Sequence, residues 1–182
     1  MKNFLAAAAG LFLWVTAGAQ NLSVSTNLLD CLELGTLNLE ASCGIGRRWT
    51  VNAGVKYNPF SYGSGKSEFS SRQRSFDAGA RFWPWHIYSG WWLGGKLRYQ
   101  EYSRGGFSGP RTREGDRYGG GVSGGYSFML TPFMNLDLGV GLWGGFDRYT
   151  VYECQRCGSV AGGGGEFFLL PNDILVTIAF IF

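Results

Sequence analysis

From residue 22 onwards, apolar and polar residues alternate along much of the chain. In the stretch 49–57, for example, Trp49, Val51 and Val55 lie on one side of an extended chain and Asn52 lies on the other. A period of two is typical of β-strands that have one apolar face and one polar face. We predict eight such strands, at residues 22–30, 37–46, 49–57, 73–83, 91–100, 117–128, 134–149 and 174–182.

The connections between these strands alternate in length. Those at residues 47–48, around Pro84 and around Pro132 are short, whereas 62–72, 101–116 and 150–172 are long and rich in Gly, Ser and charge. Short turns at one end and long loops at the other are typical of outer-membrane barrels. We therefore predict an all-β fold, a transmembrane antiparallel up-and-down β-barrel of about eight strands in the cell outer membrane. The glycine run 162–165 is placed in the last loop.

Aromatic residues favour this barrel over a soluble β-sandwich, which is the main alternative. They gather in two sets, one beside the short turns and one beside the long loops, as the two interfacial girdles of a membrane barrel do. The first set is Trp49, Trp83, Trp85, Phe128 and Phe133, and the second is Tyr57, Phe60, Tyr99, Tyr102, Tyr118, Phe146 and Tyr149.

The N-terminus has the features of a cleavable signal peptide, which we predict at residues 1–19. Lys2 is basic, residues 4–15 are apolar but too few to span a bilayer as a helix, and Ala17 and Ala19 are the small residues that a signal peptidase recognises. The barrel would then occupy residues 20–182. The net charge of +3 is too small to support a nucleic-acid partner, so none is expected.

With the apolar faces turned outward, nine charged residues point into the barrel. They are Glu40, Lys56, Asp77, Arg81, Lys96, Arg98, Arg117, Asp137 and Asp147. Because an unpaired buried charge is costly, we expect internal salt bridges. Side chains just fill the interior of an eight-stranded barrel, so we predict a plugged polar core, with a narrow ion path as the alternative. Interior glycines such as Gly125 and Gly139 are expected to leave room for the arginines and lysines.

Cys154 and Cys157 form a Cys-x-x-Cys pair in the last predicted loop. A zinc site would need a second close pair, and Cys31 and Cys43 are too far apart for that, while a redox dithiol would need a thioredoxin-like context. We therefore favour a disulfide that staples the loop, and we predict no metal and no cofactor. The only histidine, His86, lies at a short turn, away from the outer end where a lipid-modifying enzyme would need its base.

The chain ends on Phe182, and Phe180 and Ile178 precede it at two-residue steps. This ending looks like the signal that barrel-insertion machinery recognises. We therefore expect the barrel-assembly machinery and outer-membrane lipid as partners.

Several short stretches, taken in order, resemble a family of small outer-membrane barrels of unknown function from Gram-negative anaerobes. They are residues 27–29, 46–51, 57–60, 118–121, 135–137, the Cys-x-x-Cys-Gly motif at 154–158, and Phe182. Cys31 and Cys43 depart from the family pattern. The resemblance implies an outer-membrane barrel, with some members encoded beside fimbrial or surface-assembly genes. It implies no known activity and no catalytic residues.

These observations together predict a non-enzymatic barrel with a structural or interaction role at the cell surface and an envelope or fimbrial protein as partner. Aromatic and arginine side chains are the usual anchors of protein interfaces. The loop residues expected to make the contact are Tyr62, Arg72, Tyr102, Arg104, Arg111, Tyr149 and Tyr152. The two alternative functions are a narrow channel and an outer-leaflet lipid-modifying enzyme.

Overall fold

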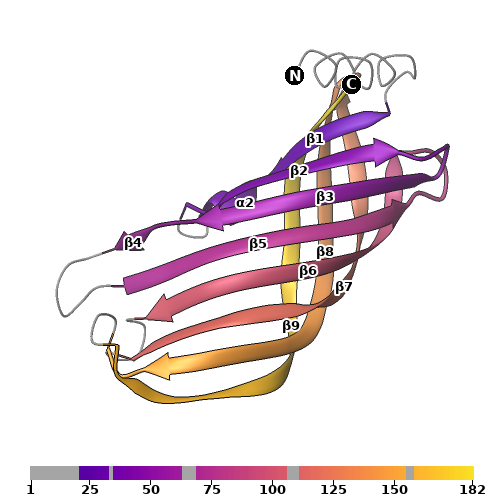
Figure 1. Ribbon diagram of the computed structural model, residues 1–182. Helices are drawn as coiled ribbons and strands as arrows, with labels where there is room; N and C mark the ends of the chain where they lie inside the picture. The colour runs from indigo at the N-terminus through magenta and orange to yellow at the C-terminus, as the bar shows by residue number, and fades with distance from the viewer. Residues whose placement is uncertain (1–20, 33–34, 63–68, 106–110, 155–157) are drawn as a thin grey trace, which may run out of the picture.

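The computed structural model describes residues 21–32, 35–62, 69–105, 111–154 and 158–182. These form a closed antiparallel barrel, which confirms the predicted all-β class and the eight strand positions (Figure 1). In chain order the elements are β1 (Leu22–Asn27), α2 (Leu28–Leu32), β2 (Leu37–Gly44), β3 (Trp49–Asn58), β4 (Ser61–Tyr62), β5 (Phe69–Phe82), β6 (Gly90–Gly105), β7 (Thr112–Thr131), β8 (Met134–Tyr152) and β9 (Val160–Ile181). In this described part, no helix is long and apolar enough to cross a membrane.

Each strand pairs with its sequence neighbours, and β1 pairs with β9 to close the wall. The two-residue strand β4 takes up the position of β3 beside β5, after the chain passes Pro59, so β3 and β4 together form one of the eight strand positions. The connections at 45–48, 83–89 and 132–133 lie at the same end as the C-terminus, which we call the turn end. We call the opposite end the loop end (Figure 1).

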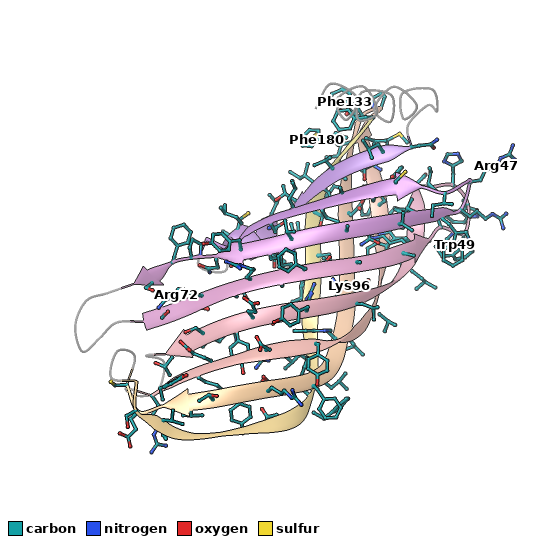
Figure 2. The ribbon with its side chains drawn as sticks, in the orientation of Figure 1. Arg47, Trp49, Arg72, Lys96, Phe133 and Phe180 are labelled. Carbon is teal, nitrogen blue, oxygen red and sulfur yellow. The ribbon has the colours of Figure 1, made fainter. Side chains whose placement is uncertain are left out.

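The two faces of the wall differ as the alternation predicts. Along β3 the residues alternate between exposed and buried, with Trp49 and Val51 outside and Thr50 and Asn52 inside. The outer face carries large apolar side chains on every long strand. On β6, for example, Trp91, Leu93 and Leu97 are all more than half exposed. The barrel thus has an apolar outside and a largely polar inside, the reverse of a soluble domain (Figure 2).

The strands run further toward the loop end than the sequence pattern predicts. Strand β6 continues to Gly105 and β7 starts at Thr112, although we predicted a loop over 101–116. The prediction was wrong because 101–116 is polar on both faces, so no alternation marks it as a strand. At the loop end the wall is therefore a projecting sheet rather than a set of long loops (Figure 1).

Strand β9 shows the same difference at its start. We placed residues 150–172 in a loop, but β9 begins at Val160 and the glycine run 162–165 lies inside it. Its pairing with β8 shifts by one residue between Gly141 and Trp143, which is a β-bulge beside Pro171. Proline cannot donate a hydrogen bond to a ladder and is tolerated at bulges, so Pro171 does not end the strand.

Strand β1 is shorter than predicted because it stops at Asn27 and the chain turns into α2. The side chain of Asn27 accepts a hydrogen bond from the Leu29 N–H at 3.3 Å, as expected of an asparagine at a helix start. The same amide donates to the Ile174 carbonyl at 3.2 Å and accepts from the Val176 N–H at 3.1 Å on β9. Asn27 therefore ends the strand and extends the β1–β9 seam by side-chain contacts.

The connection 83–89 folds back and closes the turn end of the barrel. Trp83, Ile87, Tyr88 and Trp92 form a buried cluster with Ile181 of β9. Trp83 is fully buried, and its indole N–H donates to the Thr50 hydroxyl at 3.1 Å. The prediction that Trp83 belongs to a girdle was wrong, because the turn directs this ring inward. Trp85, two residues later, is 67% exposed, as predicted.

Two interior glycines make room for a tryptophan rather than for basic side chains. A Cβ atom on Gly125 would lie 2.7 Å from the Trp92 ring, and one on Gly139 would lie 2.8 Å from it. The expectation that these glycines accommodate arginine or lysine was therefore wrong. Trp92 was not predicted to face inward, because its neighbours Trp91 and Leu93 carry the apolar alternation.

Candidate functional site

The predicted interior charges form separate groups at different heights in the barrel. Arg81 lies nearest the turn end and binds both Glu40 and Asp137, the latter at 3.4 Å. Its guanidinium also lies over the Trp92 ring, 4.7 Å from the centroid. Ser127 donates to Asp137 at 2.6 Å. These side chains fill the lumen on the loop-end side of the buried cluster that closes the turn end.

A second group occupies the middle of the barrel. Arg98 faces Asp77 at 3.7 Å and lies over the ring of Trp143, 5.1 Å from the centroid. Lys56 binds Asp30 of α2 at 2.6 Å. A small cavity of about 30 Å³ lies among these charges, and its lining includes Asp30, Lys56, Asp77, Lys96 and Arg98. The middle of the lumen is thus packed with paired charges.

The third group, which we call the Asp147 cluster, lies nearest the loop end. Asp147 is fully buried and accepts hydrogen bonds at 2.9 Å from Arg113, Arg117 and the Tyr102 hydroxyl. Arg113 also donates to the Tyr102 hydroxyl at 3.0 Å and binds Glu166 of β9. The cluster thus joins side chains from β6, β7, β8 and β9.

Burial and neighbouring charges both shift the pKa values of Tyr102 and Arg113 in this cluster. Burial raises the pKa of the Tyr102 hydroxyl, and its hydrogen bond to Asp147 raises it further. Burial by itself would lower the pKa of the Arg113 guanidinium, but the hydrogen bond to Glu166 and the neighbouring acidic groups raise it overall. Tyr102 therefore stays neutral and Arg113 stays charged over the physiological range.

A cavity of about 900 Å³ lies at the loop end, between the ends of β3, β5, β6, β7, β8 and β9. Its lining includes Tyr102 and Tyr149 and the charged Arg72. The Arg113 guanidinium lies 3.6 Å from the centroid of the Tyr149 ring, so the Asp147 cluster supports one side of this lining. Size and mixed polar and aromatic lining are in the range of ligand or peptide pockets.

Eight of the nine predicted interior charges form ion pairs in these groups, but the sequence missed several of the other members. Asp30 was placed at the end of the first predicted strand with no interior role. Arg113 and Glu166 were placed outside the predicted strands, and Trp92 and Trp143 were not assigned to the interior. Arg113 and Glu166 follow the alternation only when β7 and β9 are extended past their apolar parts. No signal in the sequence marks that extension.

The predicted contact residues at the loop end occupy several environments. Tyr102 is buried inside the Asp147 cluster, so its assignments to a girdle and to an exposed loop were both wrong. Arg72 and Arg104 lie on strands, as do Tyr149 and Tyr152, while Arg111 is exposed just before β7. The side chain of Tyr62 lies outside the part that the structure describes.

The predicted disulfide involves Cys157, which lies outside the described residues, so the pairing with Cys154 stays a prediction. Cys31 and Cys43 are both free and exposed. His86 lies on the exposed connection at the turn end, where its ring nitrogen is 3.1 Å from the Ile87 carbonyl oxygen. Within the described part of the chain, His, Cys, Asp and Glu side chains form no group of three or more that could hold a metal ion.

Two residues of the predicted insertion signal, Ile178 and Phe180, lie at the turn end of β9, and Phe182 directly follows the strand. Phe180 pairs with Val24 of β1 and Ile178 pairs with Thr26. The backbone N–H of Phe182 donates to the Leu22 carbonyl at 2.8 Å. Phe180 and Phe182 are 42% and 67% exposed on the outside of the barrel, and Figure 2 labels Phe180 beside Phe133 near this end.

Comparison with curated proteins finds no match, and comparison with solved structures finds none either. One family, described as proteins of unknown function (DUF3575), matches residues 5–182, which is nearly the whole chain. The chain belongs to this family of proteins of unknown function.

Proposed function

We propose that this protein is exported behind a cleavable signal peptide and inserted in the cell outer membrane. There its loop end would serve as a non-enzymatic binding surface on the cell exterior. The observation that carries the proposal is the apolar outer face of β6. Its outward side chains from Trp91 to Tyr99 are apolar or glycine over nine residues, and a transmembrane β-strand needs about 9–11 residues.

The boundary of this apolar band toward the loop end supports the membrane location. Five aromatic residues lie in register across neighbouring strands on the outer face: Phe76, Tyr99, Tyr118, Phe146 and Phe167. Two residues closer to the loop end, the register aligns four charged residues: Arg74, Glu101, Asp116 and Arg148. An aromatic row followed by a charged row is what a lipid–water interface favours.

The direction of insertion follows from the connections. In outer-membrane barrels the short turns face the periplasm and the longer connections face outside. The turn end would then be periplasmic. The projecting strands, the 900 Å³ cavity and the Asp147 cluster would face outward. The ion pairs and tryptophans that pack the lumen favour a binding role over the alternative of a narrow channel.

The partner we propose is another envelope or surface protein, such as a fimbrial component. The loop end offers tyrosines and arginines, including Tyr149, Tyr152 and Arg148, around the cavity. Such side chains dominate the binding energy of protein interfaces. We propose no catalytic step, because the buried Asp147 is held by two arginines and a tyrosine instead of facing a reactive group.

The first experiment locates the protein and tests closure of the barrel. Cells are fractionated, and the outer-membrane fraction is run on cold SDS gels with and without boiling. We expect the protein in this fraction, migrating faster when unboiled, because the closed sheet resists SDS until heated. A protein found only in the soluble periplasm, with no shift, would refute the membrane location.

A second experiment tests whether lipid surrounds the band. Leu97→Arg places a charge in the middle of the apolar band of β6, where Leu97 is 72% exposed. We expect a loss of about 2–4 kcal/mol in the free energy of unfolding in lipid vesicles. The control is Ser103→Arg, on the same face beyond the charged row, which should change little. Equal effects of the two substitutions would contradict the proposed membrane boundary.

Exposure of the loop end is tested on intact cells. In a background with Cys31, Cys43, Cys154 and Cys157 replaced by serine, Thr150→Cys is compared with Trp85→Cys for labelling by a membrane-impermeant maleimide. We expect labelling at position 150 and none at position 85, since they lie at opposite ends. Labelling of position 85 alone would invert the proposed orientation.

A further inference from the structure

One edge of the projecting sheet has no strand beside it in the described part of the chain. Strand β9 pairs with β8 over its whole length, from Val160 to Phe180. On its other side β1 reaches only from Thr177 to Ile181, because β1 stops at Asn27. Residues 160–170 of β9 therefore form an open edge, which is the margin of the sheet at the loop end, below β8 in Figure 1. We call this segment the β9 edge.

The register shows which backbone groups of the β9 edge are free to bind. At the turn end, Ile181 donates toward Phe133 on the β8 side, whereas Phe182 donates toward Leu22 on the β1 side. Alternate residues of an antiparallel strand thus serve opposite neighbours. The one-residue shift at the bulge reverses this order. Between this bulge and the second register shift at Ala161, the residues whose N–H and C=O groups face away from β8 are Gly163, Gly165, Phe167 and Leu169.

The β9 edge lacks the usual protection against further pairing. Natural proteins protect exposed edges with proline, bulges or charged side chains. Here Pro171 and one bulge lie at the base of the edge, and a second register shift lies at its tip, between Gly162 and Val160. Residues 163–170 between them contain no proline and one charged side chain, Glu166, which Arg113 binds. A Cβ atom on Gly162 would meet nothing within 4 Å. The glycine run thus leaves the backbone open to a close approach.

We propose that the β9 edge binds an extended segment of a separate polypeptide by antiparallel β-strand addition. In this mode backbone hydrogen bonds provide affinity and alternate side chains provide selectivity. Large apolar or aromatic side chains on the added strand would lie opposite the glycines, where they cover backbone that glycine leaves bare. Its residue nearest the membrane would meet Phe167, which is 68% exposed on the outer face and belongs to the aromatic row.

A second copy of this chain does not fit the edge, given the proposed membrane location on which this argument rests. Two copies inserted in the same direction are related by a twofold axis along the membrane normal. Strands of membrane barrels tilt by about 35–45°, so the two β9 edges would cross at about 70–90°. Neighbouring strands in a sheet differ by only about 20–25°. A separate, extended polypeptide is free to align with the edge.

The test uses a matched pair of substitutions at Gly165. Gly165→Pro removes an N–H that faces the free side and leaves the hydrogen bonds to β8 intact. Gly165→Ala adds the same Cβ atom, which would lie 3.6 Å from the Asp147 carbonyl in ordinary contact, and keeps the N–H. Cold SDS gels of both variants establish that the barrel is folded before binding is measured.

The probe is a fluorescent synthetic peptide with the sequence of residues 144–152, which pairs with this segment of β9 from the β8 side. Anisotropy is measured on the full-length protein folded in detergent micelles. We expect binding to the parent and to Gly165→Ala, and about tenfold weaker binding to Gly165→Pro. A version of the peptide N-methylated at alternate residues should also bind more weakly.

Three results would overturn this proposal. They are no binding to the folded parent protein, equal binding by the alanine and proline variants, and a parent dimer in detergent that Gly165→Pro makes monomeric. The last result would assign the edge to a second copy. None of these results depends on where the protein resides in the cell. Failure of the peptide-binding test can therefore be distinguished from failure of the fractionation test.

Discussion

The two ends of the barrel contain similar side chains but use them differently. At the turn end, Trp83 and Trp92 pack with Tyr88 into a closed apolar cluster, and Arg81 covers it. At the loop end, Tyr102 and Arg113 hold a buried carboxylate, and an open cavity lies beside them. Packed side chains therefore close the barrel at the turn end, whereas the loop end has an open cavity.

The strands themselves follow the same division. Near the turn end every strand has two neighbours, and the β1–β9 seam completes the wall. Toward the loop end β1 and β2 are missing, so β9 keeps one neighbour. Segments with few neighbours open more easily than a closed core. We therefore expect the turn end to set global stability and the loop end to open locally.

The largest expected effect is at the turn end, where Trp83→Ala removes a fully buried indole and its hydrogen bond to Thr50. We expect a loss of about 3–5 kcal/mol in the free energy of unfolding. Urea unfolding in lipid vesicles measures it. Trp85→Ala, two residues away on an exposed ring, is the control and should change stability by less than about 0.5 kcal/mol. Similar losses for both would show that the cluster does not close the barrel.

The next effect is at the loop end, where Asp147→Asn leaves Arg113 and Arg117 without their shared carboxylate. Breaking a buried ion pair costs about 3–5 kcal/mol, and we expect the lower figure here because Arg113 is partly exposed. Hydrogen exchange should rise in β7, β8 and β9 near the loop end and stay unchanged near Trp83. Uniform exchange along the strands would contradict the division into two regions.

A smaller effect distinguishes glycines at the two ends. Gly139→Val would place a side chain against the Trp92 ring, and overpacking of this kind costs about 1–3 kcal/mol. Gly162→Val, in the open β9 edge, has no such neighbour and should not destabilise the barrel. Thermal unfolding monitored by gel mobility compares the two. A larger loss at position 162 would mean that the edge is covered.

The smallest effect we predict is for Tyr102→Phe, which removes one of the hydrogen bonds to Asp147 while both arginines remain. We expect a loss of about 1 kcal/mol. The Tyr102 pKa is raised in the folded state, so the stability that its neutral hydroxyl gives is present below its ordinary pKa and is lost as pH rises through the raised value. Alkaline unfolding of the parent and variant should converge at high pH. A constant difference at all pH values would contradict this assignment.

The sequence predicted most of the wall and part of the interior. All eight predicted strands are present. Apolar and polar residues alternate along a strand that has one apolar and one polar face, because successive side chains point to opposite faces. The ends of β6, β7 and β9 toward the loop end were missed, since both of their faces are polar or glycine-rich there and alternation disappears. Trp83 was misplaced because a turn can direct a side chain to either side, and only its surroundings decide which.

The sequence by itself determined the class of fold, the number of strand positions and the inward direction of the charged residues on the strands' alternating parts. These follow from local periodicity, which needs no knowledge of distant residues. Only the tertiary structure decided that Arg81 meets Asp137, that Arg113 meets Asp147 and that β9 keeps an open edge. Those contacts depend on the register around the closed barrel and on where each strand stops, which no single stretch of sequence contains.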